Sequence, residues 1–82
     1  MRADQQLDIC GEVIPVSLAL CKSVLARMGA GAVLEIRLRD PDTLQDLLMI
    51  VERSGDKVLA WEDREQCYFL WVRKNPRQNA GS

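Results

Sequence analysis

Apolar residues recur at helical spacing in two separate segments of this 82-residue chain. The first segment runs from Pro15 to Met28, and its apolar stripe consists of Leu18, Cys21, Leu25 and Met28. The second follows the possible N-cap residues Asp40 to Thr43 and ends at Gly55. Its apolar stripe consists of Leu44, Leu47, Leu48 and Val51. Two helices are therefore predicted, each with one face that must be buried.

Residues 7–10 and Val33 to Arg39 alternate apolar and polar residues, as strands with one buried face do. Two more strands are predicted at about Lys57 to Glu62 and Cys67 to Lys74. The predicted order is β-α-β-α-β-β, in which the last two strands form an antiparallel hairpin through the polar residues 63–66. A chain this short has no room for a third layer.

The fold class that follows is α+β, a two-layer α/β sandwich. We expect a four-stranded mixed sheet with both helices on one face, and its first two strands are parallel if they pair. One domain over residues 7–74 is expected, with flexible termini at residues 1–6 and 75–82.

The composition excludes several function classes. The chain has 11 Lys and Arg against 12 Asp and Glu, whereas nucleic-acid and membrane-surface binders carry a basic excess. It has no histidine, which excludes histidine acid–base catalysis and imidazole metal ligands. Its three cysteines lack metal-site spacing, so we expect no metal and no cofactor. Without a secretory signal or a long apolar run, a cytoplasmic protein with free thiols and no membrane partner is expected.

Several short motifs resemble those of the TusA/SirA-like small sulfur-carrier proteins. These motifs are Leu7-Asp8-x-x-Gly11-x-x-Ile14-Pro15, the glycine-bounded helix ends, Asp40-Pro41, Asp46, Gly55 and Val72-Arg73-Lys74. The resemblance extends from about Leu7 to Lys74 and implies the two-layer sandwich of that family. It also implies sulfurtransferase chemistry, in which a cysteine persulfide relays sulfur between protein partners.

That family carries its reactive cysteine in a Cys-Pro-x-Pro motif at the start of the first helix. Unpaired N–H groups and the positive end of the helix dipole lower the pKa of a thiol there. Aligning Gly11 and Pro15 places Ile14 at the cysteine position and Ser17 at the second proline. Asp56 stands where the family often has histidine. Because isoleucine carries no sulfur, altered or lost catalytic activity is expected, and whether the chain is an enzyme stays open.

Cys10 is the candidate for a surrogate catalytic thiol, because it lies beside the loop that would carry the missing cysteine. The alternation places it with Asp8, opposite Leu7 and Ile9, and predicts partial exposure. The simpler interpretation is an ordinary cysteine on the sheet face, since nothing near it in sequence lowers its pKa. Cys21 lies on the apolar stripe of the first helix and is expected to be buried.

The last strand is expected to turn Tyr68, Leu70 and Val72 toward the helices, because the opposite phase would turn Arg73 inward. Cys67, Phe69 and Trp71 then face the open side of the sheet, with both aromatic rings exposed near Arg37 and Arg39. Three interpretations stay open: tolerated exposed aromatics, an interface for self-association or a partner, and stacking on single-stranded RNA. The acidic charge balance argues against RNA.

Val13, Ile14 and Val16 form an apolar lip at the start of the first helix, which either packs on the core or docks a partner. Two function classes therefore compete. One is a TusA-like protein associated with sulfur relay, in which Ile14 has altered or abolished catalysis. The other is a non-catalytic binding or regulatory module that acts through protein–protein contacts. The expected partners are other sulfur-relay proteins or a second copy of the chain.

Overall fold

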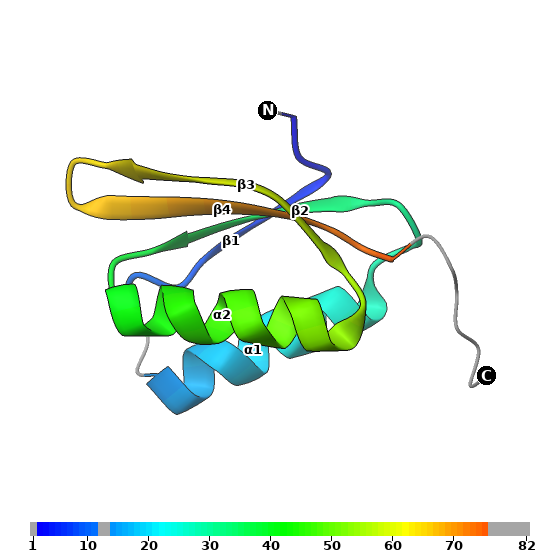
Figure 1. Ribbon diagram of the computed structural model, residues 1–82, viewed down its shortest axis with the longest axis horizontal. Coiled ribbons are helices and arrows are strands. Elements are labelled where there is room, and N and C mark those ends of the chain that lie inside the picture. The colour runs from blue at the N-terminus through cyan, green and yellow to red at the C-terminus, as the bar shows by residue number, and fades with distance from the viewer. Residues whose placement is uncertain (1, 12–13, 76–82) are drawn as a thin grey trace.

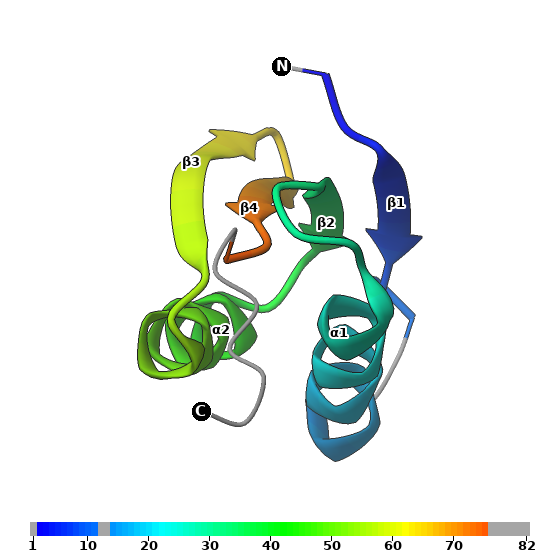
Figure 2. The same cartoon turned by 90° about the vertical axis from the view of Figure 1, so that its right-hand side faces the viewer.

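The computed structural model describes residues 2–11 and 14–75, which contain four strands and two helices. Along the chain they are β1 (Gln5–Asp8), α1 (Ile14–Arg27), β2 (Val33–Leu38), α2 (Pro41–Ser54), β3 (Lys57–Arg64) and β4 (Cys67–Arg73). The strands form one sheet in the order β1-β2-β4-β3, and both helices lie on one face of it (Figure 1). Figure 2 shows the same two layers from the side. The predicted α+β sandwich is therefore confirmed.

The directions of the strands bring three chain segments to one end of the sheet. β1 pairs with β2 in parallel, as the right-handed crossover rule predicted, and β4 pairs with both β2 and β3 in antiparallel fashion. The last residues of β1 and β2 therefore lie at the same end as the first residues of β4. This end of the sheet carries the candidate site.

The core lies between the sheet and the helices and is built from the predicted apolar stripes. It contains Leu34, Ile36 and Leu38 from β2, Leu70 and Val72 from β4, Cys21, Leu25 and Met28 from α1, and Leu44, Leu47 and Val51 from α2. Tyr68 packs against its edge. The predicted phase of the last strand is therefore confirmed, because the residues expected to face the helices are those that enter the core.

β1 is shifted toward the N-terminus compared with the prediction. The N–H of Asp4 donates to the carbonyl of Val33 (2.8 Å), and the N–H of Val33 donates to Oδ2 of Asp4 (2.8 Å). Residues 4–6, which the prediction placed outside the domain, are thus paired with β2. The strand ends at Asp8 rather than Cys10, because Oδ1 of Asp8 accepts the N–H of Cys10 (2.9 Å) and the chain turns there.

The hairpin between β3 and β4 is tighter than the polar residues suggested. β3 continues to Arg64, and the expected linker of residues 63–66 shrinks to a turn of Glu65 and Gln66, in which Glu65 has a φ of 56°. Polar side chains do not prevent pairing where both faces of a strand are exposed, since the backbone groups still gain hydrogen bonds. In this longer hairpin Arg64 is the residue of β3 that pairs directly opposite Cys67 of β4.

The caps of α2 agree with the prediction. Oδ2 of Asp40 accepts hydrogen bonds from the backbone N–H (3.0 Å) and the hydroxyl (2.8 Å) of Thr43. At the other end Gly55 has a φ of 85°, a left-handed conformation that glycine adopts without a steric penalty. Neither helix described here has the length and apolar character needed to cross a membrane.

Candidate functional site: a pair of thiols at the end of the sheet

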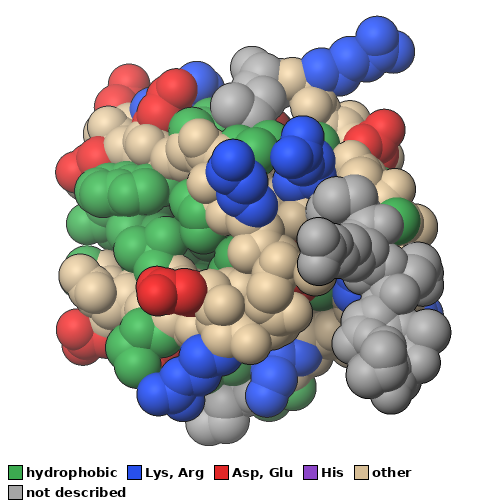
Figure 3. Space-filling view, turned by 45° about the vertical axis from the view of Figure 1, so that its right-hand side comes forward, with side chains coloured by type: hydrophobic (Ala, Val, Ile, Leu, Met, Phe, Trp, Pro, Cys, Tyr) green, Lys and Arg blue, Asp and Glu red, His purple; other side chains and the backbone are tan. Residues whose placement is uncertain are grey.

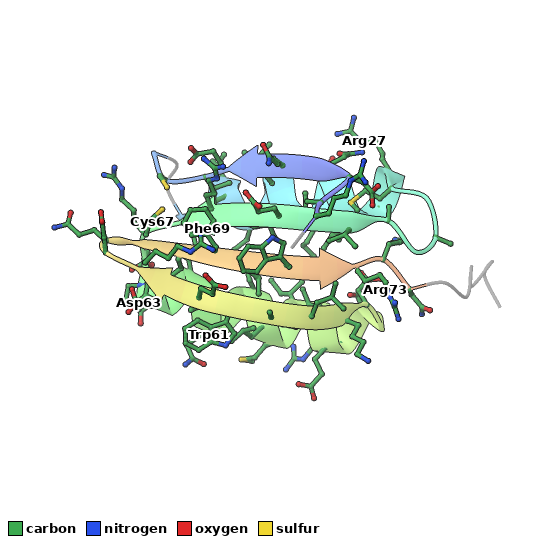
Figure 4. All side chains as sticks on the ribbon, turned by 90° about the horizontal axis from the view of Figure 1, so that it is seen from above. Arg27, Trp61, Asp63, Cys67, Phe69 and Arg73 are labelled. Atoms are coloured by element: carbon green, nitrogen blue, oxygen red, sulfur yellow. The ribbon has the colours of Figure 1, made fainter. Side chains whose placement is uncertain are left out.

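The thiols of Cys10 and Cys67 lie together on the sheet face that the helices leave open. Their Sγ atoms are 3.7 Å apart, although 57 positions separate the two residues in the chain. Both residues are half-buried and neither is in a disulfide. Figure 4 shows Cys67 next to Phe69 along β4, at the end of the sheet where β1 also ends. The third cysteine, Cys21, is fully buried in the core, as predicted.

Backbone hydrogen bonds hold Cys10 in this position. After β1, the N–H of Ile9 donates to the carbonyl of Arg37 (2.9 Å), which continues the pairing with β2 for one more residue. The carboxylate of Asp8 then turns the chain at Cys10. Cys67 is the first residue of β4, on the other side of β2. The thiol pair therefore spans the end of β2.

Both thiols were predicted to lie on the open face, but they were not predicted to lie together. The missing step was the strand order, because the prediction placed Phe69 and Trp71 near Arg37 and Arg39 without saying which strand lies between residues 7–10 and residues 67–74. A signal for it exists. The segment Cys67 to Val72 is almost entirely apolar, as expected of a central strand, whereas residues 57–64 carry four charges, as expected of an edge strand.

The surroundings of Cys10 make its thiol a weak acid. Burial, together with the neighbouring carboxylate of Asp8 and the thiol of Cys67, raises the pKa of Cys10 to about 11. The pKa of Asp8 is lowered, chiefly because its carboxylate accepts the backbone N–H of Cys10, and Arg37 and Arg39 add to this effect. Cys10 is therefore protonated at neutral pH while Asp8 is ionised. Burial alone raises the pKa of Cys21 to about 11.

Of the two aromatic residues predicted to be exposed near this site, Trp71 is buried and Phe69 is half-buried. Trp71 lies on the open face in the predicted register, but it is only 2 % exposed, so the prediction of an exposed ring is wrong. Its indole N–H donates to Oε1 of Glu35 (3.1 Å), and its ring stacks on the half-buried Phe69 with centroids 6.1 Å apart. The aromatic residues therefore form a small second core on the open face.

Arginines of the protein itself cover this second core. The guanidinium carbon of Arg64 lies 4.7 Å from the ring centroid of Phe69 and 5.9 Å from that of Trp71, while that of Arg37 lies 5.2 Å from Phe69. Glu35 and Glu62 accept hydrogen bonds from Nε of Arg37 (3.1 Å) and Arg64 (2.6 Å) respectively. Arg39, also predicted to lie here, is exposed. Trp71 thus has almost no exposed surface, and Phe69 is half-buried beneath these arginines.

At the start of α1, the first helical residue is Ile14. Val13 lies outside the described residues, so the predicted apolar lip is visible only at Val16, whose side chain is 46 % exposed. Ser17, one residue further, is buried. The residue that the resemblance aligned with the family's cysteine is thus the first residue of α1.

Comparisons with known proteins show the family and the fold of the chain. The family model described as sulfurtransferase TusA matches residues 5–74. The chain belongs to the TusA family. The sulfur carrier protein TusA of Allochromatium vinosum is 24 % identical over 72 residues, which are 88 % of this chain and 95 % of that protein. The crystal structure of a SirA-like protein from Desulfitobacterium hafniense has a similar fold, with a TM-score of 0.78 and 20 % identity over 87 % of this chain and 97 % of that one.

Asp56, which the sequence resemblance placed at a frequent histidine position of the family, has structural contacts in this chain. Its Oδ2 accepts the hydroxyl hydrogen of Ser54 (3.0 Å), and its Oδ1 accepts the backbone N–H of Asn75 (2.8 Å). These bonds join the end of α2 to the segment that follows β4. Both carboxylate oxygens are thus engaged in holding the fold together.

The raised pKa of Cys10 predicts an unusual alkylation profile for this TusA-family protein. Because only the thiolate reacts, the rate of Cys10 with iodoacetamide should rise about tenfold per pH unit between about pH 7 and 10. Peptide mapping of the alkylated protein at each pH measures this rate. A rate that levels off near about pH 8.5 would show an ordinary cysteine and contradict the environment described here.

Proposed function

We propose that this TusA-family protein acts in sulfur relay with other proteins, and that it takes up sulfur at the Cys10–Cys67 pair instead of at the start of α1. The observation that carries the proposal is the pair of half-buried thiols with Sγ atoms 3.7 Å apart. Ile14 removes the thiol of the usual position, so catalysis of the usual kind is lost there and sulfur chemistry, if retained, needs another cysteine.

Within the pair, Cys67 is the better acceptor of sulfur. A sulfur acceptor attacks as the thiolate, and the thiol of Cys10 is held protonated by burial and by the carboxylate of Asp8, which raise its pKa. Cys21 is closed off in the core. The free thiols fit a reducing compartment such as the cytoplasm. The Allochromatium vinosum relative, named as a sulfur carrier, supports the same pathway.

Two variants, each lacking one cysteine of the pair, test this assignment. Each variant is incubated with glutathione persulfide and its intact mass is then measured. The Cys10→Ser variant should gain the mass of one sulfur atom on Cys67, and the Cys67→Ser variant should load at least about tenfold more slowly, because the remaining thiol is protonated. If neither variant gains sulfur, the proposal fails.

The second candidate, a non-catalytic binding or regulatory module, is favoured by exposed apolar side chains. Val16 and Leu20 are exposed on α1, Met49 on α2 and Trp61 on β3, and the ring of Trp61 contacts Tyr68 edge-on (centroids 6.2 Å apart). Figure 3 shows hydrophobic side chains gathered in one exposed area among acidic residues. Such areas are typical of protein-binding surfaces. This function is the one that remains if no thiol takes up sulfur.

A further inference from the structure

We infer that Cys10 and Cys67 form a dithiol site that resolves a persulfide, so that sulfur delivered to Cys67 is released as hydrogen sulfide and an intramolecular disulfide is left behind. The inference rests on the proposed function, because it starts from sulfur loaded on Cys67. It goes beyond carrying sulfur, since the sulfur is reduced before it leaves the protein. The chemical class of the substrate is a persulfide, R–S–SH.

The distance between the two thiols suits this reaction. At 3.7 Å the two Sγ atoms are already in van der Waals contact, and a disulfide requires about 2 Å. Rotation of the two side chains about their Cα–Cβ bonds changes this distance without moving the backbone. The remaining approach is therefore within the reach of the two side chains.

The fold also keeps the two thiols in contact when no sulfur is bound. Cys67 is fixed in β4, and Cys10 is fixed by the hydrogen bond from its N–H to Asp8 and by the pairing of Ile9 with Arg37. Two groups held in this way react as if each were present at a very high concentration near the other. This proximity offsets the small thiolate fraction of Cys10 that its raised pKa allows.

The reaction has two steps, and both balance. The thiolate of Cys67 attacks the outer sulfur of R–S–SH, which gives Cys67–S–SH and releases the donor as its thiolate. Cys10 then loses its proton and attacks Sγ of Cys67. The bond from that Sγ to the outer sulfur breaks, and the outer sulfur leaves as HS⁻, which takes up the proton as H₂S. The two cysteine sulfurs are oxidised to the disulfide, and the sulfane sulfur is reduced to sulfide.

A reductant of the dithiol class returns the site to its starting state. It donates two electrons and two protons to the Cys10–Cys67 disulfide and becomes a disulfide itself. The net reaction converts the persulfide and the dithiol into a thiol, H₂S and a disulfide. The third cysteine takes no part, because Cys21 belongs to α1 and is buried in the core on the other face of the sheet.

The test uses the full chain, reduced, loaded with glutathione persulfide and then desalted, with no reductant present. Intact mass and released sulfide are followed over time. The wild type should lose the mass of two hydrogens relative to the reduced protein and release one sulfide per chain. The Cys10→Ser variant, in which serine keeps the size of the side chain, should retain its extra sulfur and release sulfide at least about tenfold more slowly. The Cys21→Ala variant is the matched control and should behave as the wild type.

Failure of the inference can be told apart from failure of the proposed function. If Cys10→Ser loads and the wild type also keeps its extra sulfur without forming a disulfide, the inference is overturned while the proposed function stands. If no variant loads at all, the proposed function fails, and the inference fails with it.

Discussion

Replacing Trp71 by alanine should lower the free energy of unfolding by about 3–5 kcal/mol, the range typical of a buried tryptophan. Trp71 is 2 % exposed even though it faces away from the main core. The substitution removes its stacking on Phe69 and leaves Oε1 of the buried Glu35 without the indole hydrogen bond. A chain of 82 residues has a total stability of only about 4–12 kcal/mol, so the variant should be close to unfolding. Urea denaturation followed by circular dichroism measures the change.

Trp61 provides the matched control, because it is the other tryptophan of the chain and is 48 % exposed. Trp61→Ala should cost less than about 1 kcal/mol, as surface substitutions do. The milder Trp71→Phe variant keeps an aromatic ring but loses the bond to Glu35, and it should cost about 1–3 kcal/mol. Equal effects of Trp71→Ala and Trp61→Ala would contradict the covered aromatic core on the open face.

At Trp71 the direction of the side chain was predictable from the sequence, whereas its burial was not. The two-residue period of a strand, together with the cost of turning Arg73 inward, predicted correctly which side chains of β4 face the helices. Burial on the open face was not predictable in the same way, because it depends on groups that are distant in the chain. Glu35 comes from β2, and Arg64 reaches the rings only because the hairpin pairs further than its polar residues suggested. Local alternation carries no information about such covering groups.

The candidate site was predictable to a similar extent. The resemblance and the helix start identified Ile14 as the departure from the family, and the alternation identified Cys10 as a partly exposed thiol. Cys67 could be recognised as the second thiol of the site only from the strand order. That order sets β4 beside β2, so that Cys67, the first residue of β4, lies beside the turn after β1. A contact over 57 positions follows from tertiary topology and not from spacing in the sequence.

The central claim is that sulfur binds to the pair at the end of the sheet and not at the start of α1. Removing both thiols of the pair should therefore abolish sulfur uptake, and adding a thiol at the start of α1 should restore it. Cys10→Ser/Cys67→Ser retains only the buried Cys21 and should take up no sulfur. Adding Ile14→Cys to this variant should restore uptake, because the helix start supplies unpaired N–H groups that lower the pKa of a thiol there.

The most direct measurement is the mass of sulfur gained from glutathione persulfide by three proteins side by side: Cys10→Ser, Cys10→Ser/Cys67→Ser, and the latter with Ile14→Cys. The account predicts one sulfur atom on the first, none on the second and one on the third, mapped to Cys67 and to position 14 respectively. Sulfur uptake by Cys10→Ser/Cys67→Ser at the same rate as by Cys10→Ser would contradict it, since the thiol pair would then not be the site.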